Sequence, residues 1–476
     1  MRLLPLLLLA CSPGNDRSGS VSADTMATCR IVPPDATALH ADERHLKDGH
    51  GRRVFLRGIN TGGRSKFPPY MPFDHAEGDH ASALATYLDR AQEWGFTTLR
   101  VPFSWAAFEP VEGQDDEAWA RKYDALLDGA ADRGMWTIVD FHQDVYGEFF
   151  CGDGFPRWTV DDPGEDRHDC ADWFFGYLTN DQVAQAFDDF WADDSPVMAA
   201  FESMWDRMVD RHASRPGVIG YEIINEPGNG LGDERTWERE TLTPFYSRMA
   251  SRMQAVDPDA LVFFDSTGLA AVQSTTHMER PSGDNLVFAP HSYDPSIFVG
   301  GGALDASLVA ERLAGWDALG AEWNMPVLVG EFGGSQGLEG IAAYSGAHFD
   351  AFDALQGHGT LWEYSDAAET WNHEDFSLVG PDGSIRMDSV DAVVRAYPRA
   401  LAETDPARTV WFWDAGTHTL TLEYDGVPDG VSEIVLPPWW FATGAAVSGT
   451  GACHQVRGDR LHLRADGGPV SVVVSP

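Results

Sequence analysis

A chain of 476 residues is long enough for one large domain and a smaller second one. Hydrophobic residues make up 43% of the sequence, which is enough for a sizeable core and excludes a wholly disordered chain. Acidic residues number 74 and basic residues 33, so the formal net charge is −41. A field of this sign repels phosphate backbones and anionic lipids, so a nucleic-acid partner is excluded.

The N-terminus has the pattern of an export signal. Arg2 precedes an apolar run over 3–10, which is far shorter than the roughly 20 residues of a membrane-spanning helix. The run ends in Leu-Leu-Ala-Cys, which resembles a bacterial lipobox, and the polar stretch 12–24 resembles a flexible tether. We therefore expect an exported protein, secreted or lipid-anchored at the bacterial cell surface. Lipid attachment at Cys11 and ordinary secretion both remain open.

Four cysteines follow Cys11, and export would allow them to form disulfides. Cys151 and Cys170 bracket one long loop, so we favour this pair. Closing such a loop stabilises the fold by about 3 kcal/mol in the chain-entropy model. Cys29 would then pair with Cys453 by elimination. The cysteine spacings do not resemble a zinc site, and we expect no bound metal.

Eight short apolar runs alternate with helix-period patterns through most of the chain. The runs cover 54–60, 97–102, 136–142, 218–226, 261–267, 286–293, 326–333 and 359–365. Several are apolar nearly throughout, as expected for strands buried on both faces. The alternation predicts an α/β fold, a (β/α)8 TIM barrel. A doubly wound open sheet is the alternative, although no G-x-G-x-x-G follows the first run.

Two further segments define the expected domain organisation. The segment 143–196 is long for one connection between a strand and a helix, and we expect it to form one wall of a substrate cleft. After about residue 400, short alternating strands with turn signals predict a small β-sandwich, with 433–441 among the strands. We therefore expect a signal and tether over 1–24, a catalytic barrel over 25–400 and a C-terminal β-sandwich over 401–476.

Two of the predicted strands end in glutamate. The fourth reads YEIINEPG, with Asn225 before Glu226, and the seventh reads VLVGEFGG, with Glu331. Strand ends on the C-terminal face of a barrel carry the active site. One such glutamate could be an ion-pair partner, but two on these strands are the pair that glycoside hydrolysis needs, one protonated and one ionised.

Longer motifs make the interpretation more specific. The sequence contains FLRGIN, GGRSKFPP, LRVPFSWAAFEP, DFHQDVYG, GDGFPRW, INEP, PHSYDP, GEFGG and LWEYSD. Over about residues 50–400 it resembles glycoside hydrolase family 5 and, within it, the endoglycoceramidases. The resemblance implies a retaining hydrolase that cleaves the β-glycosidic bond between oligosaccharide and ceramide in glycosphingolipids. It implies no cofactor.

The resemblance also implies individual roles. Glu226 would be the acid/base and Glu331 the nucleophile. The other expected catalytic residues are Asn225, Arg100, His291 and Tyr293. The expected substrate-binding residues are Lys66, His142, Asp144, Trp158 and Trp362. These types suit the roles, because arginine keeps a carboxylate ionised and tryptophan offers a flat apolar face to a sugar ring. Each of them also occurs as a plain structural residue of barrels.

A glycolipid substrate would need an apolar surface beside the sugar cleft. The candidates are the aromatic and aliphatic runs 149–150, 173–175 and 297–299, on predicted loops at the catalytic face. We expect a monomer that contacts a neutral membrane or micelle surface transiently, because the negative charge disfavours anionic lipids. Packing of these side chains beneath their own loops is the alternative.

Two other functions remain open from the sequence. The first is a β-1,4-glucanase or β-glucosidase of the same family. The second, from another class, is an inert carbohydrate- or lipid-binding surface protein on the same scaffold. The residues also leave open the preferred glycan series and the choice between endo cleavage and release of a single sugar.

Overall fold

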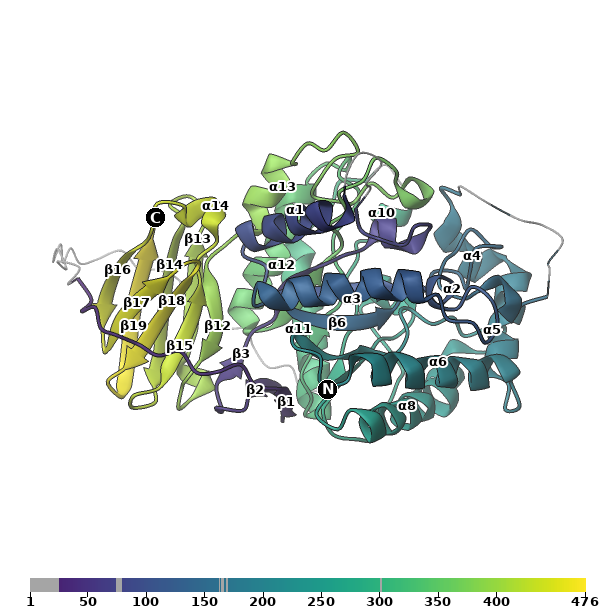
Figure 1. The fold of residues 1–476 in the computed structure, drawn as a ribbon, viewed down its shortest axis with the longest axis horizontal. Helices are drawn as coiled ribbons and strands as arrows, with labels where there is room; N and C mark the ends of the chain where they lie inside the picture. The colour runs from purple at the N-terminus through teal and green to yellow at the C-terminus, as the bar shows by residue number, and fades with distance from the viewer. Residues whose placement is uncertain (1–24, 74–78, 162, 164–166, 168–169, 300–301) are drawn as a thin grey trace, which may run out of the picture.

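The computed structural model describes residues 25–476, apart from 74–78, 162, 164–166, 168–169 and 300–301. The expected export signal, the tether and Cys11 lie outside the described residues. Among the residues that are described, no helix combines the length and the apolar character needed to cross a bilayer. Figure 1 shows a barrel ringed by helices beside a smaller body of β-strands.

Eight parallel strands form the barrel, in the order β10-β11-β4-β5-β6-β7-β8-β9. They are β4 (Arg57–Asn60), β5 (Thr98–Phe103), β6 (Trp136–Phe141), β7 (Val218–Glu222), β8 (Leu261–Phe264), β9 (Leu286–Phe288), β10 (Leu328–Val329) and β11 (His358–Leu361). A parallel bridge between Phe288 and Val327 joins the two ends of this sheet. The predicted (β/α)8 barrel is therefore confirmed, and an open doubly wound sheet is not formed.

Helices surround the barrel and bury one apolar stripe each. The longer ones are α1 (His80–Glu93), α3 (Glu117–Asp132), α5 (Asp181–Trp191), α6 (Pro196–His212), α8 (Thr243–Val256), α11 (Val309–Trp323) and α12 (Ile341–Leu355). The shorter ones are α2 (Trp105–Phe108), α4 (Gly176–Thr179), α7 (Glu234–Trp237), α9 (Gly268–Gln273), α10 (Ser296–Val299) and α13 (Met387–Val393). In α3, Asp116 caps the first turn, while Tyr123, Leu127 and Ala130 face the core at helical spacing.

The smaller body consists of two packed antiparallel sheets. One has the order β13-β14-β19-β16 and the other β1-β2-β3-β12-β15-β18-β17. The strands of the first sheet are β13 (Val410–Asp414), β14 (Thr419–Gly426), β16 (Ala446–Thr450) and β19 (Gly468–Ser475). Those of the second are β1 (Leu39–Asp42), β2 (His45–Asp48), β3 (Arg53–Val54), β12 (Tyr397–Leu401), β15 (Val431–Val435), β17 (Ala452–Arg457) and β18 (Arg460–Ala465). The two sheets enclose a core that includes Trp411, Leu422 and Leu461.

One detail of the predicted sandwich is wrong. The strand expected over 433–441 ends at Val435, and Pro438–Phe441 form the short helix α14. Consecutive prolines at 437 and 438 remove two ladder donors, and proline suits the first turn of a helix. The strand pattern therefore cannot continue through them.

The N-terminal segment ties the two bodies together. Strand β3 pairs with β12, and Cys29 forms a disulfide with Cys453, so the start of the described chain lies along the C-terminal sheets, as Figure 1 shows. Leu39 and Leu46 of the β1–β2 hairpin belong to one buried cluster with barrel-strand residues such as Phe263. The hairpin therefore closes the end of the barrel at which the strands begin, and the other end carries the loops.

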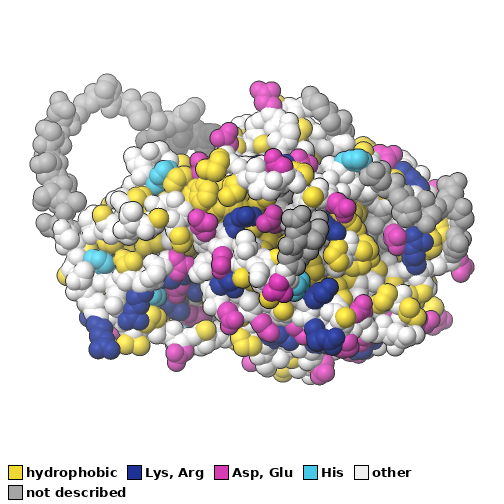
Figure 2. Space-filling view, turned by 45° about the horizontal axis from the view of Figure 1, so that its top comes forward, with side chains coloured by type: hydrophobic (Ala, Val, Ile, Leu, Met, Phe, Trp, Pro, Cys, Tyr) yellow, Lys and Arg dark blue, Asp and Glu magenta, His cyan; other side chains and the backbone are white. Residues whose placement is uncertain are grey.

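Charged side chains of both signs cover the face in Figure 2, with acidic groups spread over it rather than gathered in one region. The excess of acidic over basic residues comes from the composition, 74 against 33.

Candidate active site

Glu226 and Glu331 meet at the loop end of the barrel. Glu226 lies four residues beyond β7 and Glu331 two residues beyond β10. One carboxylate oxygen of each lies within 4.8 Å of the other. Carboxyl groups of retaining glycosidases are about 5–5.5 Å apart, whereas inverting enzymes need about 6.5–9.5 Å. Glu226 has φ of 37°, in the left-handed region that a non-glycine residue adopts only where the surrounding structure enforces it.

Glu331 is surrounded by hydrogen-bond donors that suit a carboxylate. Arg100 Nη1 donates to its Oε1 at 2.7 Å, and the Tyr293 hydroxyl donates to its Oε2 at 2.8 Å. Both donors are buried, so solvent does not screen them. Charge-assisted bonds of this kind favour the ionised form of a carboxyl and fix its orientation.

Glu226 has the opposite environment. Burial, and then the negative charge of Asp144, raise the pKa of Glu226 to about 8. His291 Nδ1 lies 2.7 Å from Glu226 Oε1, and burial lowers the pKa of His291 to about 4. A neutral imidazole beside a protonated carboxyl leaves Glu226 able to give up a proton. Glu226 therefore has the raised pKa that a proton donor in glycoside hydrolysis needs, whereas Glu331 accepts hydrogen bonds from Arg100 and Tyr293.

Arg100 is the centre of a buried network that extends beyond the predicted residues. It donates to both oxygens of Glu222 at 2.8 Å, to Asn225 Oδ1 at 2.8 Å and to Asn60 Oδ1 at 3.0 Å. Asn225 thereby sits beside the guanidinium that holds Glu331. Sequence reasoning missed Glu222 and Asn60, although a glutamate inside an otherwise apolar strand was an available signal.

Lys66 belongs to the expected sugar-binding wall, the group formed by Lys66, His142, Asp144 and Trp362. Its Nζ donates to Asp144 Oδ2 at 2.6 Å and to Glu374 Oε2 at 3.2 Å. Although burial opposes it, the charges of Asp144 and Glu374 raise the pKa of Lys66. The ammonium also lies 4.5 Å from the ring centre of Trp362 and 4.2 Å from that of Trp371. Glu374 and Trp371 were not predicted, because polar loop residues carry no signal of their partners.

His142 and Trp362 form a stacked pair next to this group. Their ring centres are 4.9 Å apart with the planes inclined by 9°. His142 Nδ1 lies 2.9 Å from Asp140 Oδ2, and its Nε2 lies 3.6 Å from Asp144 Oδ2. Against the effect of burial, bonds to Asp140 and Asp144 raise the pKa of His142 to about 10. A charged imidazole thus holds Trp362 in place.

Trp158 is placed differently from the other predicted residues. Its indole N–H donates to the backbone carbonyl of Glu109 at 3.0 Å, and its ring packs edge-on against Trp105 at 5.1 Å. These contacts hold it against the loop after β5. The structure therefore groups Lys66, His142, Asp144 and Trp362 but sets Trp158 beside another loop.

Glu226, His291 and Glu331 together offer three metal-ligand atoms within 4.8 Å of one another. A divalent cation is chemically conceivable there. His291 and Tyr293, however, already hydrogen-bond one oxygen of each glutamate.

The predicted apolar runs differ in where they lie. Phe150 is only 3% exposed, so it packs beneath its own loop. Phe174 stacks on Phe298 with ring centres 4.1 Å apart, and Phe298 packs against Tyr293 of the catalytic group at 6.0 Å. Phe175 is 37% exposed. The runs around 174 and 298 thus form an aromatic cluster beside Tyr293, with Phe175 as its exposed member.

Comparisons with known proteins agree with this geometry. The model of the cellulase family, glycosyl hydrolase family 5, matches residues 48–368. Endoglycoceramidase I of Rhodococcus hoagii (strain 103S) is 25% identical over 405 residues, which cover 80% of this chain and 76% of that protein. The structure of endo-glycoceramidase II from Rhodococcus sp. with a five-membered iminocyclitol is 26% identical, with a TM-score of 0.75, and covers 91% of this chain and 99% of its own. The lactosyl-enzyme intermediate of that enzyme is 25% identical, with a TM-score of 0.73 and the same coverage.

Proposed function

The chain belongs to glycosyl hydrolase family 5, and from that premise we propose that it cleaves the β-glycosidic bond between an oligosaccharide and ceramide. The observation that carries the proposal is the pair Glu226 and Glu331, within 4.8 Å and in opposite protonation environments. This separation supports a retaining mechanism. The covalent lactosyl-enzyme intermediate described for the Rhodococcus enzyme supports the same stereochemistry.

In this mechanism Glu331 attacks the anomeric carbon while Glu226 protonates the oxygen that leaves with ceramide. The bond from the sugar to that oxygen breaks, and a glycosyl ester forms on Glu331. Glu226, now ionised, then takes a proton from water, and the water oxygen displaces Glu331 from the anomeric carbon. Arg100 and Tyr293 hold the nucleophile, and His291 keeps the acid/base in position.

The remaining predicted residues have supporting roles in the proposal. Asn225, fixed by Arg100, would bond the sugar 2-hydroxyl beside the nucleophile. Trp362 would stack beneath the ring at the cleavage point, with His142 behind it. Lys66 and Asp144 would bond the next sugar. Trp158, whose indole N–H is bonded to the Glu109 carbonyl, would offer its ring to the sugars of the non-reducing side.

Ceramide would leave the cleft over an aromatic surface. Ile297 and Phe298 pack against a small buried group that contains Tyr293 and Trp362, directly beside the glutamates. A lipid released at this point meets apolar side chains rather than bulk water. The net charge of −41 supports transient contact with a neutral membrane or micelle.

We also propose that the protein is exported. The disulfides Cys29–Cys453 and Cys151–Cys170 support an oxidising compartment. The same proposal includes lipid attachment at Cys11 and a tether over 12–24. It also includes a catalytic domain over 25–400, a β-sandwich over 401–476 and a monomeric state.

The experiment compares the wild type with Glu226→Gln and Glu331→Gln on lactosylceramide in non-ionic detergent micelles. We expect the wild type to release intact lactose. In each variant the rate of release should fall by about 10³ or more, because Glu226→Gln lacks the proton donor and Glu331→Gln lacks the nucleophile. Glu93→Gln, an exposed residue at the end of α1, is the matched control.

A soluble β-1,4-glucan provides the rival substrate, because the family model is that of cellulases. Release of cello-oligosaccharides together with inactivity on lactosylceramide would replace the proposal with a glucanase. Normal turnover by either glutamine variant would remove the catalytic assignment itself.

A further inference from the structure

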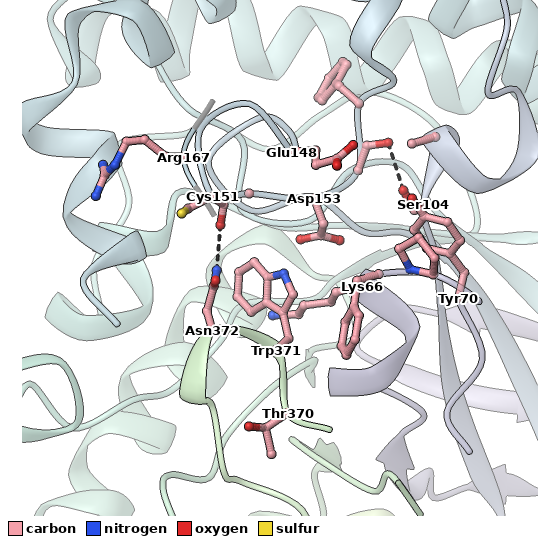
Figure 3. Close-up of a pocket in the computed structure, with 16 residues that line it drawn as sticks. Lys66, Tyr70, Ser104, Glu148, Cys151, Asp153, Arg167, Thr370, Trp371 and Asn372 are labelled. Atoms are coloured by element: carbon pink, nitrogen blue, oxygen red, sulfur yellow. Dashed lines mark hydrogen bonds between the residues drawn. The ribbon is translucent and has the colours of Figure 1, made fainter. Parts of the chain in front are cut away.

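A cavity of about 260 Å³ opens beside Lys66. Its wall comes from four segments of the chain, which contribute Lys66 and Tyr70, Ser104, Asp153 and Trp371, as Figure 3 shows. Small-molecule sites start at about 300 Å³ and combine apolar walls with a few placed polar groups. The cavity has this composition and nearly this size.

Asp153 is the polar group without a partner in this cavity. Its side chain is 4% exposed, and neither carboxyl oxygen has a hydrogen-bond partner among the described residues. In Figure 3 its carboxyl group points toward Lys66 and Trp371. Leaving a buried polar group unbonded costs about 1–3 kcal/mol, so such a group in a cavity indicates an absent ligand.

The backbone fixes Asp153 firmly. Its N–H donates to the carbonyl of Asp144 at 3.0 Å, and the Asp144 N–H donates back at 3.3 Å. A side chain at Gly152 would collide with Asp144 O, since an added Cβ would lie 2.0 Å from it. The disulfide Cys151–Cys170 begins two residues before Asp153. A carboxyl group held this rigidly is preorganised for one ligand geometry.

The protonation of Asp153 suits a hydroxyl-bearing ligand. Burial, and then the negative charge of Asp144, raise the pKa of Asp153 well above its usual range. A protonated carboxyl offers one donor and remaining acceptors, which matches the donor and acceptor capacity of a sugar hydroxyl. The ring of Trp371, which lines the same cavity, provides a flat face for a pyranose.

The cavity is continuous with the sugar-binding wall. Lys66 lines it and also bonds Asp144 and Glu374, and Glu374 accepts a hydrogen bond from the Trp362 indole N–H at 3.2 Å. Lys66 Nζ lies 4.2 Å from the ring centre of Trp371, so a glycan bound along Trp362 and Lys66 would meet Trp371 and Asp153 with its next ring. We infer that Asp153 and Trp371 form a subsite for a third sugar of the glycan, counted from ceramide. This inference rests on the proposed function.

The test measures kcat/KM for lactosylceramide and for galactosyl-lactosylceramide, in the same detergent micelles. The wild type should prefer the three-sugar substrate. Asp153→Ala should lower the three-sugar to two-sugar ratio by about tenfold, the worth of one hydrogen bond. Asp153→Asn keeps a donor and an acceptor and should restore most of the ratio.

Asp161→Asn, an exposed residue of the same loop, is the matched control and should leave the ratio at the wild-type value. A wild type without preference for the longer glycan overturns the inference. An equal loss on both substrates in Asp153→Ala does so too, because it would indicate a purely structural role.

A separate measurement keeps this result distinct from failure of the proposed function. If no glycolipid is cleaved, the proposed function is lost, and calorimetry with free galactosyl-lactose and free lactose still tests the subsite. Tighter binding of the trisaccharide that disappears in Asp153→Ala supports the inference. Equal binding of the two sugars overturns it.

Discussion

Replacing Tyr293 by phenylalanine removes one hydrogen bond from the expected nucleophile and leaves the ring in place. The hydroxyl donates to Glu331 Oε2 at 2.8 Å, inside a site where both residues are at most 5% exposed. A hydrogen bond to a charged group contributes about 1.5–3 kcal/mol. Since about 1.4 kcal/mol corresponds to a factor of ten, we expect kcat/KM to fall by about 10- to 150-fold. The assay is the initial rate of lactose release from lactosylceramide micelles.

Tyr246→Phe is the matched control for this change. Tyr246 is also buried, but its hydroxyl has no hydrogen-bond partner among the described residues. Its loss should leave kcat/KM within about twofold of the wild type, because no bond is broken. Equal rates for Tyr293→Phe and Tyr246→Phe would refute the role of the hydroxyl in holding Glu331.

Three further predictions follow from the same structure. Because Glu226 must be protonated to act as an acid, kcat/KM should fall as pH rises through about 8, and a pH–rate profile that is flat from 7 to 9.5 would contradict this. Replacing Cys151 and Cys170 by serine should lower the free energy of unfolding by about 3 kcal/mol, measured by denaturant titration against the wild type under oxidising conditions. Gly62→Ala would place a Cβ 2.5 Å from the Trp362 ring, so the indole must move, and KM for lactosylceramide should rise; an unchanged KM would count against Trp362 as the sugar platform.

The sequence predicted the elements of the barrel because each strand has a local signature. An apolar run that ends in Glu226 or Glu331 predicts a strand, and it also predicts that the carboxyl group lies at the C-terminal end of the barrel. The roles of Asn225 and Arg100 came instead from the resemblance to the family, since neither residue type at these positions is diagnostic by itself. The loop cysteines could also be paired, because Cys151 and Cys170 are near each other in the chain.

Contacts between distant segments could not be predicted in this way. Glu374 reaches Lys66 from a loop more than 300 positions later, and its local sequence resembles any polar loop. Asp153 was hidden for the same reason, since its significance comes from burial in a cavity rather than from its neighbours. The pairing of β3 with β12 joins residues almost 350 positions apart, and no periodicity reports such a partner.

That last pairing has a consequence for how the molecule is made. Strands β1 to β3 leave the ribosome first, but the strand that β3 must join is synthesised only after the whole barrel. Leu39 and Leu46 of the first hairpin therefore stay uncovered until the barrel strands that they pack against have been made, and β3 stays unpaired with β12 until residues 397–401 exist. Removing everything beyond residue 396 would take away β12 and leave β3 without the strand that it pairs with there, so the small β body and the barrel mature as one unit.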